Sequence, residues 1–452
     1  MPDSLPQRLG LIALLVYMFV LISRVLDVTS LQLRIPMMLY LVMLAMAMLS
    51  GFSRVFSLRV NWWFVLYLIW MAIAIPTSHW RAGSIAHWNN CLKIFLFFLC
   101  VQVLANNWRK LRSAIWVLAL GLLLAAILSR LVGDYSTGRL KLEVGTLSDP
   151  NDFAMYMIMA LCLWLLLWQT SSNPMATSLL FLIPLLLVLV SFIGTGSRGG
   201  LISLVVVFLV WLIHMPRRGR LGIIAALMIL VPAAPLVMSD YVKSRFLTIN
   251  SVDETDGIDM QTANMLGSSV ASTESRKQLF LQSVEITVSH PVFGIGPGMF
   301  PVYTDFLAKQ AGFPRGQWQP THNLFTQISS ECGIPALVLY LLAVFEVIRG
   351  LRRVRRSREQ FASVEGMRQA AGYLLMAFYG LLAAGMFLSI AYTTAIYVIA
   401  ALAVALTSIY DAEVVRHSAT PVATLPNTAP LIRKPLLTRR FPLASARLEP
   451  RG

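Results

Sequence analysis

Long apolar runs separated by short polar stretches are the feature that most limits how this chain can fold. Hydrophobic residues make up 57% of its 452 residues and charged residues only 13%, whereas charged residues are nearer a quarter in soluble proteins. The apolar runs are long enough to cross a bilayer as helices. The sequence therefore predicts an all-α polytopic membrane protein.

We predict about twelve transmembrane helices, because twelve segments have the apolar length of a span. They lie near residues 9–24, 35–52, 60–77, 88–105, 113–132, 151–169, 177–195, 199–214, 221–238, 321–346, 370–390 and 393–410. This divides the chain into helices 1–9 (residues 1–238), a large loop carrying short amphipathic helices (239–320), helices 10–12 (321–410) and a disordered basic tail (411–452).

The positions of lysine and arginine predict the orientation in the membrane. If the N-terminus is cytoplasmic, the inside loops include the dense RGLRRVRRSR run from Arg349, and the outside loops are poorer in basic residues for their length. An even number of spans then places both termini in the cytoplasm and the loop at 239–320 outside. The formal charge of +16 is explained by topology and anionic lipid headgroups, so we predict no nucleic-acid partner.

The longest polar segment of the sequence ends at residues 319–340, which read QPTHNLFTQISSECGIPALVLY. Thr321 is predicted to cap the helix that follows, because a threonine hydroxyl can accept a bond from an orphan backbone N–H. His322 then lies at the mouth of an apolar helix, where a titratable imidazole is well placed for proton transfer on a lipid-linked substrate. A surface histidine near a helix start is the alternative interpretation.

Basic residues in three outward-facing contexts are candidates for binding an anion. Arg198 lies in GTGSRGG between two apolar runs, where an arginine is costly unless it faces a partner or a wet cavity. Arg276 begins a predicted amphipathic helix, Glu274–Ser289, that we expect to lie along the membrane surface. Arg139 has a weaker context. The alternatives are a snorkelling side chain for Arg198 and a solvated charged face for the other two.

No pattern of residues predicts a metal or cofactor. The acidic run Asp253, Glu254, Asp256 and Asp259 lacks the ligand order of a calcium loop and is interpreted as a solvated loop. The four cysteines lie in or beside apolar runs without a C-x-x-C pair, so we expect neither a zinc site nor a disulfide framework. The sequence contains no H-E-x-x-H, Walker loop or G-x-S-x-G motif, and we predict metal-independent chemistry.

Three stretches together resemble a known group of enzymes. They are TLSDPNDFAMYMIMAL from Thr146, TGSRGGLISL from Thr195, and HPVFGIGPGMF from His290 followed by PTHNLFTQISSECGIPALVLYL from Pro320. Their order and spacing resemble the superfamily of O-antigen ligases, O-antigen polymerases and related bacterial oligosaccharide transferases, over roughly residues 110–410. The resemblance implies a fold like that of the C-type glycosyltransferases, with a large periplasmic loop.

The resemblance also implies a function and its residues. It implies an inverting glycosyltransferase of the bacterial inner membrane that uses a glycan linked to undecaprenyl diphosphate at the periplasmic face. The family's catalytic histidine corresponds to His322, the arginine of its S-R-G motif to Arg198, and the arginine of its periplasmic helix to Arg276. A neutral imidazole can take the proton of an acceptor hydroxyl, and arginines can offset the charge of the diphosphate leaving group.

The acceptor remains open at the level of sequence. We favour lipid A–core, the acceptor of an O-antigen ligase. An O-antigen polymerase and a protein O-oligosaccharyltransferase are alternatives that share the donor chemistry. A lipid-linked glycan transporter is the alternative from another class, and it would predict charged or broken helices at mid-membrane.

Overall fold

The computed structural model describes residues 3–28, 34–135, 138–173, 175–214, 260–314, 316 and 318–419. Within these ranges the chain is helical, apart from turns and one isolated antiparallel bridge between Asp134 and Lys141. The prediction of an all-α protein is confirmed. The predicted helix at 221–238, the acidic run from Asp253 to Asp259 and the end of the predicted tail after residue 419 lie outside the described residues.

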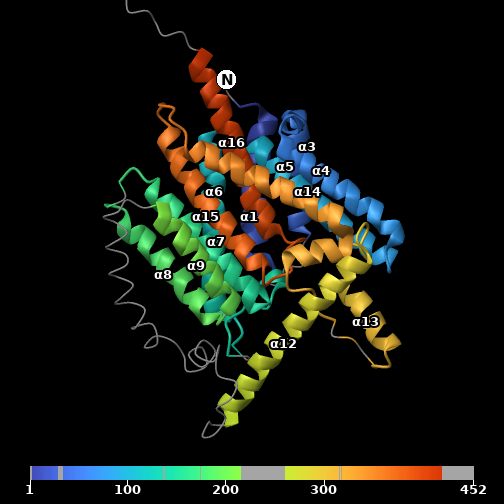
Figure 1. Cartoon of the computed structure of the whole chain (residues 1–452). Helices are drawn as coiled ribbons and strands as arrows, with labels where there is room; N and C mark the ends of the chain where they lie inside the picture. Colours follow the sequence, from blue (N-terminus) through green and yellow to red (C-terminus); the bar gives the residue numbers. More distant parts are fainter. Residues whose placement is uncertain are drawn as a thin grey trace, which may run out of the picture.

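The described helices follow the apolar runs of the sequence (Figure 1). They are α1 (Leu5–Ser23), α2 (Val25–Val28), α3 (Ile35–Leu49), α4 (Arg59–Ala74), α5 (Arg81–Leu104), α6 (Trp108–Val132), α7 (Pro150–Gln169), α8 (Ser178–Gly194), α9 (Arg198–His214), α12 (Met260–Ser289), α13 (Phe300–Gln310), α14 (Leu324–Arg355), α15 (Val364–Gly385) and α16 (Thr394–Ala419), with short 3-10 turns at η1 (Phe52–Ser57), η2 (Ile75–Thr77) and η3 (Gly145–Leu147).

Seven of the described helices are long and apolar enough to cross a membrane: α1, α4 with η2, α5, α6, α7, α14 and α16. Three further helices, α3, α8 and α9, are also apolar but shorter than these seven. These helices define a polytopic membrane protein, whereas the count of twelve spans stays a prediction.

Two helices, α7 and α16, form the centre of the bundle. The membrane-length window of α7 is 83% buried inside the protein and that of α16 is 78% buried, whereas that of α1 is only 28% buried. α7 contacts α6, α8, α9 and α15, while α16 contacts α5, α6, α14 and α15. Both helices are apolar on nearly every side, as expected of helices that are buried in the middle of a bundle or span a membrane.

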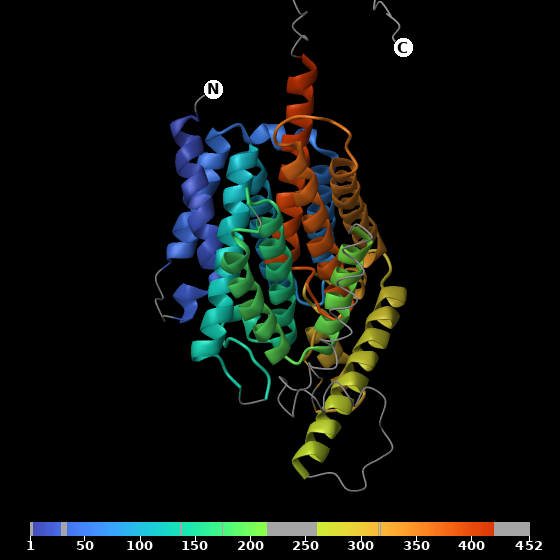
Figure 2. The ribbon, with the colours of Figure 1, turned by 90° about the vertical axis from the view of Figure 1, so that its left-hand side faces the viewer.

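The start of α1 and the end of α16 lie at one end of the bundle (Figure 2). The helices α12 and α13 lie at the opposite end in both views (Figures 1 and 2). The arginine-rich end of α14 and its connection to α15 lie at the end that holds the termini. The two ends of the molecule therefore differ in composition. The end with α12 and α13 carries part of the predicted outer loop, and the end with the termini carries the basic run of α14.

A break divides α14 at Gly333, whose φ of 84° and ψ of 170° are not helical. A Cβ at this position would lie 1.9 Å from the carbonyl oxygen of Val292, so only glycine fits. The backbone groups freed by the break bond to the turn at residues 290–299, hereafter the Gly–Pro turn. The N–H of Ile295 donates to Ser330, that of Gly296 donates to Glu331, and that of Ile334 donates to Pro291. Every one of these bonds satisfies a polar group that lipid could not satisfy.

Several predicted details are wrong. The cap of α14 is Asn323, not Thr321, because the side-chain oxygen of Asn323 accepts from the N–H groups of Phe325 and Thr326. The helix predicted at Glu274–Ser289 begins earlier, at Met260. It contacts α14 and runs obliquely to the bundle (Figures 1 and 2), and its position along the membrane surface stays a prediction.

The last predicted helices also differ from the observed ones. α14 continues to Arg355 and α16 to Ala419, both well beyond the predicted ends. Helix α15 covers residues 364–385, so residues 386–393 form a real connection before α16 where a tight turn was predicted. This connection contributes to the site described next.

Candidate active site

His322 lies at the mouth of α14 in a backbone conformation that is unusual for its residue type. Its φ is 52°, in the left-handed region where a non-glycine residue costs of order 1–3 kcal/mol. The connection between α15 and α16 holds this conformation. The N–H of His322 donates to Ser389 Oγ at 2.8 Å, and Thr321 Oγ1 lies 3.2 Å from the same oxygen. Asn323 Nδ2 donates to the carbonyl of Met386 at 3.1 Å.

The surroundings of His322 keep its imidazole neutral. Burial, and to a smaller extent the nearby charge of Arg276, lower the pKa of His322 to about 4, although the carboxylate of Asp149 acts in the opposite direction. A side chain with this pKa is uncharged near pH 7 and has a free nitrogen lone pair to accept a proton. The structure thus places Arg276 close to His322, whereas in the sequence only the family resemblance had connected these two residues. It also places the carboxylate of Asp149 near His322.

Arg276 reaches from α12 to the turn at residues 195–200, hereafter the S-R-G turn. It lines a gap of only about 10 Å³ together with Ser197 and Gly199 of that turn and Phe387 of the α15–α16 connection. Such a gap is no larger than the least space that one water needs, about 10–15 Å³. Arg276 is therefore packed directly against the S-R-G turn.

The glycines of the S-R-G turn permit close packing within the protein. A Cβ on Gly199 would lie 3.0 Å from the Cβ of Phe387, and a Cβ on Gly200 would lie 3.0 Å from the Cβ of Ala154. Protein side chains therefore occupy the space beside these glycines.

Asn151 connects the S-R-G turn to the start of α7. Its Oδ1 accepts from Ser197 Oγ and from Arg139 Nη2, both at 2.9 Å. Its Nδ2 donates to Asp149 Oδ1 at 2.9 Å, and Asp149 also caps α7 by accepting from the N–H groups of residues 151 and 152. Because Asp149 is fixed by these bonds, its charge has a defined position relative to His322.

The other two predicted arginines have different surroundings. Arg139 donates through Nε to the carbonyl of Thr195 at 2.8 Å and through Nη2 to Asn151, so it holds the S-R-G turn in place. Arg198 is the first residue of α9, directly after Ser197, and is half-buried. Arg198 belongs to the same S-R-G turn that Arg276 packs against. Arg139 contacts this turn at a different residue, Thr195.

The Gly–Pro turn, on the other side of α14, is held by a buried carboxylate. Glu331 accepts from the N–H groups of Gly298 at 2.9 Å and Phe300 at 3.2 Å, and from Tyr392 Oη at 2.6 Å. Tyr392 belongs to the same α15–α16 connection as Ser389. The positive φ angles of Gly294, Gly296 and Gly298 make this turn tight and non-helical.

Asp149, Asn151 and Ser389 were not among the site residues predicted from the sequence. The first two lie in the stretch TLSDPNDF, which resembles the family but had no predicted role. Its Asp-Pro start is the sequence signal of a capped helix and could have identified Asp149. Ser389 carried no such signal, because its contact with His322 joins residues 67 positions apart.

Among the described residues, no group of three or more histidine, cysteine, aspartate or glutamate side chains could hold a metal ion. Metal independence stays a prediction. The chemistry available at the site is that of a neutral imidazole, a fixed carboxylate and arginines beside a tightly packed turn.

An all-α membrane protein with a neutral histidine and arginines gathered at one end of the bundle defines a class of candidate membrane transferases. The family model described as O-antigen ligase matches residues 183–341. The match supports membership of the O-antigen ligase superfamily and confirms the resemblance read from the motifs. It covers Arg198, Arg276 and His322 and leaves Arg139 and Asp149 outside. A search of curated proteins found no match. The family indicates a glycosyltransferase-like enzyme with O-antigen ligase- or polymerase-type activity in general.

Proposed function

We propose that this protein transfers a glycan from a lipid diphosphate to an acceptor hydroxyl by inverting, metal-independent chemistry. The observation that carries the proposal is the neutral, half-buried His322, which lies in the segment that the family model matches and close to the charges of Arg276 and Asp149. A base needs an unprotonated nitrogen, and a diphosphate leaving group needs cationic partners.

In the proposed step, His322 accepts the proton of the acceptor hydroxyl while that oxygen attacks the anomeric carbon. The new C–O bond forms as the bond from the anomeric carbon to the diphosphate oxygen breaks, and the bonding electron pair leaves with the diphosphate. Attack from the opposite face inverts the anomeric centre. The charge of Asp149 stabilises the imidazolium that forms, and Arg276 with Arg198 offsets the charge that grows on the leaving group.

Binding of the donor would itself make His322 a better base. In the empty site, the charge of Arg276 contributes to the low pKa of His322. A diphosphate bound beside Arg276 neutralises that charge, so the pKa of His322 rises towards its ordinary value when the donor is present. The catalytic group is thereby protected from protonation in the empty enzyme and strengthened in the complex.

For the donor we propose a glycan on undecaprenyl diphosphate, and for the acceptor lipid A–core, at the periplasmic face of the bacterial inner membrane with both termini cytoplasmic. The O-antigen ligase- or polymerase-type activity that the family indicates supports these choices. We prefer a ligase to a polymerase or a protein O-oligosaccharyltransferase. Arg139, proposed from sequence as a diphosphate ligand, fits better as a residue that holds the S-R-G turn, since it donates to Thr195 and Asn151.

A transporter is less well supported. The break in α14 is a feature that a transporter would share, but its free backbone groups bond to the Gly–Pro turn. They are therefore not available to coordinate an ion or a substrate as the free ends of broken helices do in transporters.

The test is transfer by the purified full-length protein in nanodiscs, supplied with undecaprenyl-diphosphate-linked glycan and lipid A–core in the presence of a chelator. We expect release of undecaprenyl diphosphate and a glycosylated lipid A–core of inverted linkage. Glycan movement across the bilayer without transfer would instead indicate a transporter. A lipopolysaccharide gel from a deletion strain identifies the acceptor, because loss of a ligase leaves core without O-antigen and loss of a polymerase leaves a single repeat.

A further inference from the structure

A cavity of about 560 Å³ lies at the arginine-rich end of α14, on the side that faces α9 and α15. Its volume is within the range of small-molecule sites, about 300–1,000 Å³. Arg352, Arg355 and Arg356 line it. Because α14 is 32 residues long, this cavity lies roughly 40 Å from His322 along the helix. It is hereafter the arginine cavity, and it is separate from the candidate active site.

The arginines of this cavity differ from their neighbours on the same helix. Arg353 forms an ion pair with Asp411 at 2.7 Å, and Arg349 forms one with Glu346 at 3.6 Å. Within the part of the chain that the structure describes, the three arginines of the arginine cavity form no ion pair. Arg352 donates to Tyr379 Oη at 2.6 Å and lies over its ring, which fixes the guanidinium without reducing its charge.

Among the described residues, no aspartate or glutamate lines the arginine cavity. A concentration of positive charge without carboxylates requires an anion for its neutralisation, and guanidinium groups bind phosphate in a bidentate manner.

The opposite wall of the arginine cavity is apolar. It is formed by Val206, Val210 and Ile213 of α9, which are spaced by four and three residues and so share one face of that helix. Ile213 is 67% exposed, and Leu209 beside this face is 50% exposed. In a membrane protein such residues meet lipid tails. An occupant that satisfies both walls must therefore be amphiphilic, with an anionic head and an apolar chain.

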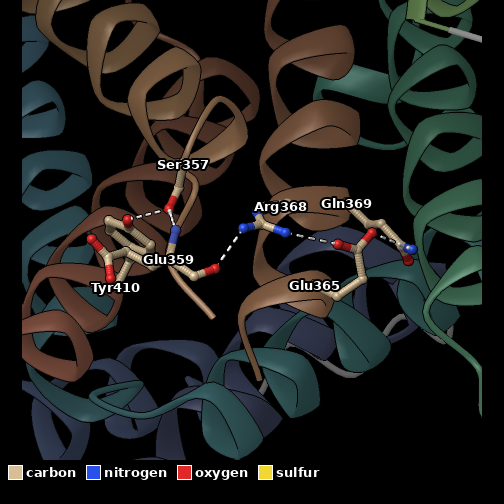
Figure 3. Close-up of polar contacts among 6 residues, drawn as sticks. All are labelled: Ser357, Glu359, Glu365, Arg368, Gln369 and Tyr410. Atoms are coloured by element: carbon tan, nitrogen blue, oxygen red, sulfur yellow. Dashed lines mark hydrogen bonds and ion pairs between the residues drawn. The ribbon is translucent and has the colours of Figure 1, made fainter. Parts of the chain in front are cut away.

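The end of α14 that carries these arginines is held by polar contacts (Figure 3). Ser357 Oγ accepts from Tyr410 Oη of α16 at 2.5 Å, and Arg368 of α15 donates to the carbonyl of Glu359 at 2.6 Å and to the carboxylate of Glu365 at 3.2 Å. The connection between α14 and α15 is thus fixed on both sides. Arginines on a fixed element bind an anion with a smaller loss of entropy than arginines on a loose one.

We propose that the arginine cavity binds the phosphate headgroup of an anionic phospholipid, in the leaflet at the end of the bundle that holds both termini. The guanidinium groups of α14 bind the phosphate, and an acyl chain lies along the apolar face of α9. The site anchors the bundle in a lipid environment of defined charge and does not depend on the transfer reaction.

The experiment compares two double variants of the full-length protein in nanodiscs of phosphatidylcholine that contain a small fraction of phosphatidylglycerol. Arg352→Gln/Arg356→Gln removes two charges from the arginine cavity. Arg349→Gln/Arg353→Gln removes two charges from the paired side of the same helix and is the matched control. The number of phosphatidylglycerol molecules retained on release from the nanodisc is measured by native mass spectrometry, and equal thermal unfolding shows that both variants are folded.

We expect the first variant to retain phosphatidylglycerol roughly 30-fold less well, because two arginines near a membrane surface together contribute about 2 kcal/mol to anionic lipid binding, and the control to change it by less than about twofold. Equal losses in the two variants would overturn the proposal, because they would reflect general surface charge. Displacement of the lipid by millimolar inorganic phosphate would also overturn it, since the site would then select a free phosphate without needing a chain.

Discussion

The two ends of α14 carry polar residues in opposite ways. At its beginning, Asn323, Gln327 and Glu331 are buried, and each accepts hydrogen bonds from protein N–H groups. At its end, Arg352 and Arg356 are exposed and face a cavity. The polar groups at the beginning of α14 are therefore satisfied within the protein and position one residue, His322. The arginines at its end that line the cavity form no ion pair among the described residues, and in our proposal a lipid phosphate outside the protein neutralises them.

The difference shows how one helix can serve two environments. Buried polar groups are costly unless each has a partner, so the bonds at the beginning of α14 specify a single geometry. Arginines at a membrane surface keep their charge accessible at little cost. Mutations at the beginning of α14 should therefore change geometry, and mutations at its end should change charge.

The largest effect is expected from His322→Ala. Loss of a general base slows the chemical step by about 10²–10⁴-fold, and we expect transfer by the purified protein to fall by that factor while folding and membrane insertion are unchanged. The control is His417→Ala, which removes an exposed histidine near the C-terminal end of α16. This variant should change turnover by less than about twofold. Wild-type turnover by the His322 variant would exclude the base assignment.

Gly333→Ala tests whether the beginning of α14 needs its break. The added Cβ would lie 1.9 Å from the Val292 carbonyl oxygen, so the helix and the Gly–Pro turn must separate. We expect a loss of about 3 kcal/mol or more in stability, as for other severe core clashes and strained backbones, measured as a fall in the unfolding temperature in detergent.

The matched control for this variant is Gly372→Ala in α15. There the new Cβ would meet Arg355 at 3.6 Å, an ordinary contact, and alanine favours a helix by up to about 1 kcal/mol over glycine. Equal stability of the two variants would show that the break in α14 is not a structural requirement.

The pH dependence of transfer tests the electrostatics around His322. Because the pKa of His322 is about 4 in the empty site, kcat/KM, which reports the free enzyme, should be constant from pH 7 to about pH 5 and fall as the pH passes below 4. In Arg276→Gln the fall should move to higher pH, since the cation that lowers the pKa is gone. In Asp149→Asn it should move to lower pH.

Arg276→Gln should also lower kcat by about 10²-fold, the usual loss when one donor to a developing anion is removed. Lys277→Gln, the exposed neighbour on α12, is the control and should leave both the rate and the pH profile unchanged. A break near pH 6.5 in the wild-type profile of kcat/KM would contradict the low pKa of His322.

Much of this architecture could be predicted from the sequence, because bilayer thickness dictates the length of an apolar run. The helix positions, the non-helical Gly–Pro turn and the place of His322 at a helix mouth all follow from local pattern. The cap of α14 could not be assigned in this way. Thr321 and Asn323 are both good capping residues, and the choice between them is decided by bonds to Met386 and Ser389, more than 60 positions away.

The same limit applies to the site as a whole. Arg139 and Arg276 were both predicted from the sequence to be outward-facing basic residues that could bind an anion. Packing makes one a support of the S-R-G turn, through Thr195 and Asn151, and places the other close enough to His322 to lower its pKa. Local pattern does not contain this information, because it depends on how α12, α7 and α9 meet.

The smallest effect is expected from Ser389→Ala, which tests how the left-handed backbone at His322 is held. The hydroxyl accepts from the His322 N–H at 2.8 Å and lies 3.2 Å from Thr321 Oγ1. A hydrogen bond of this kind contributes about 1 kcal/mol, so we expect kcat to fall by roughly fivefold with little change in KM. Ser389→Thr keeps the hydroxyl and should restore most of the rate. A fall in KM and kcat together, or no rescue by threonine, would show that Ser389 acts through packing and not by positioning His322.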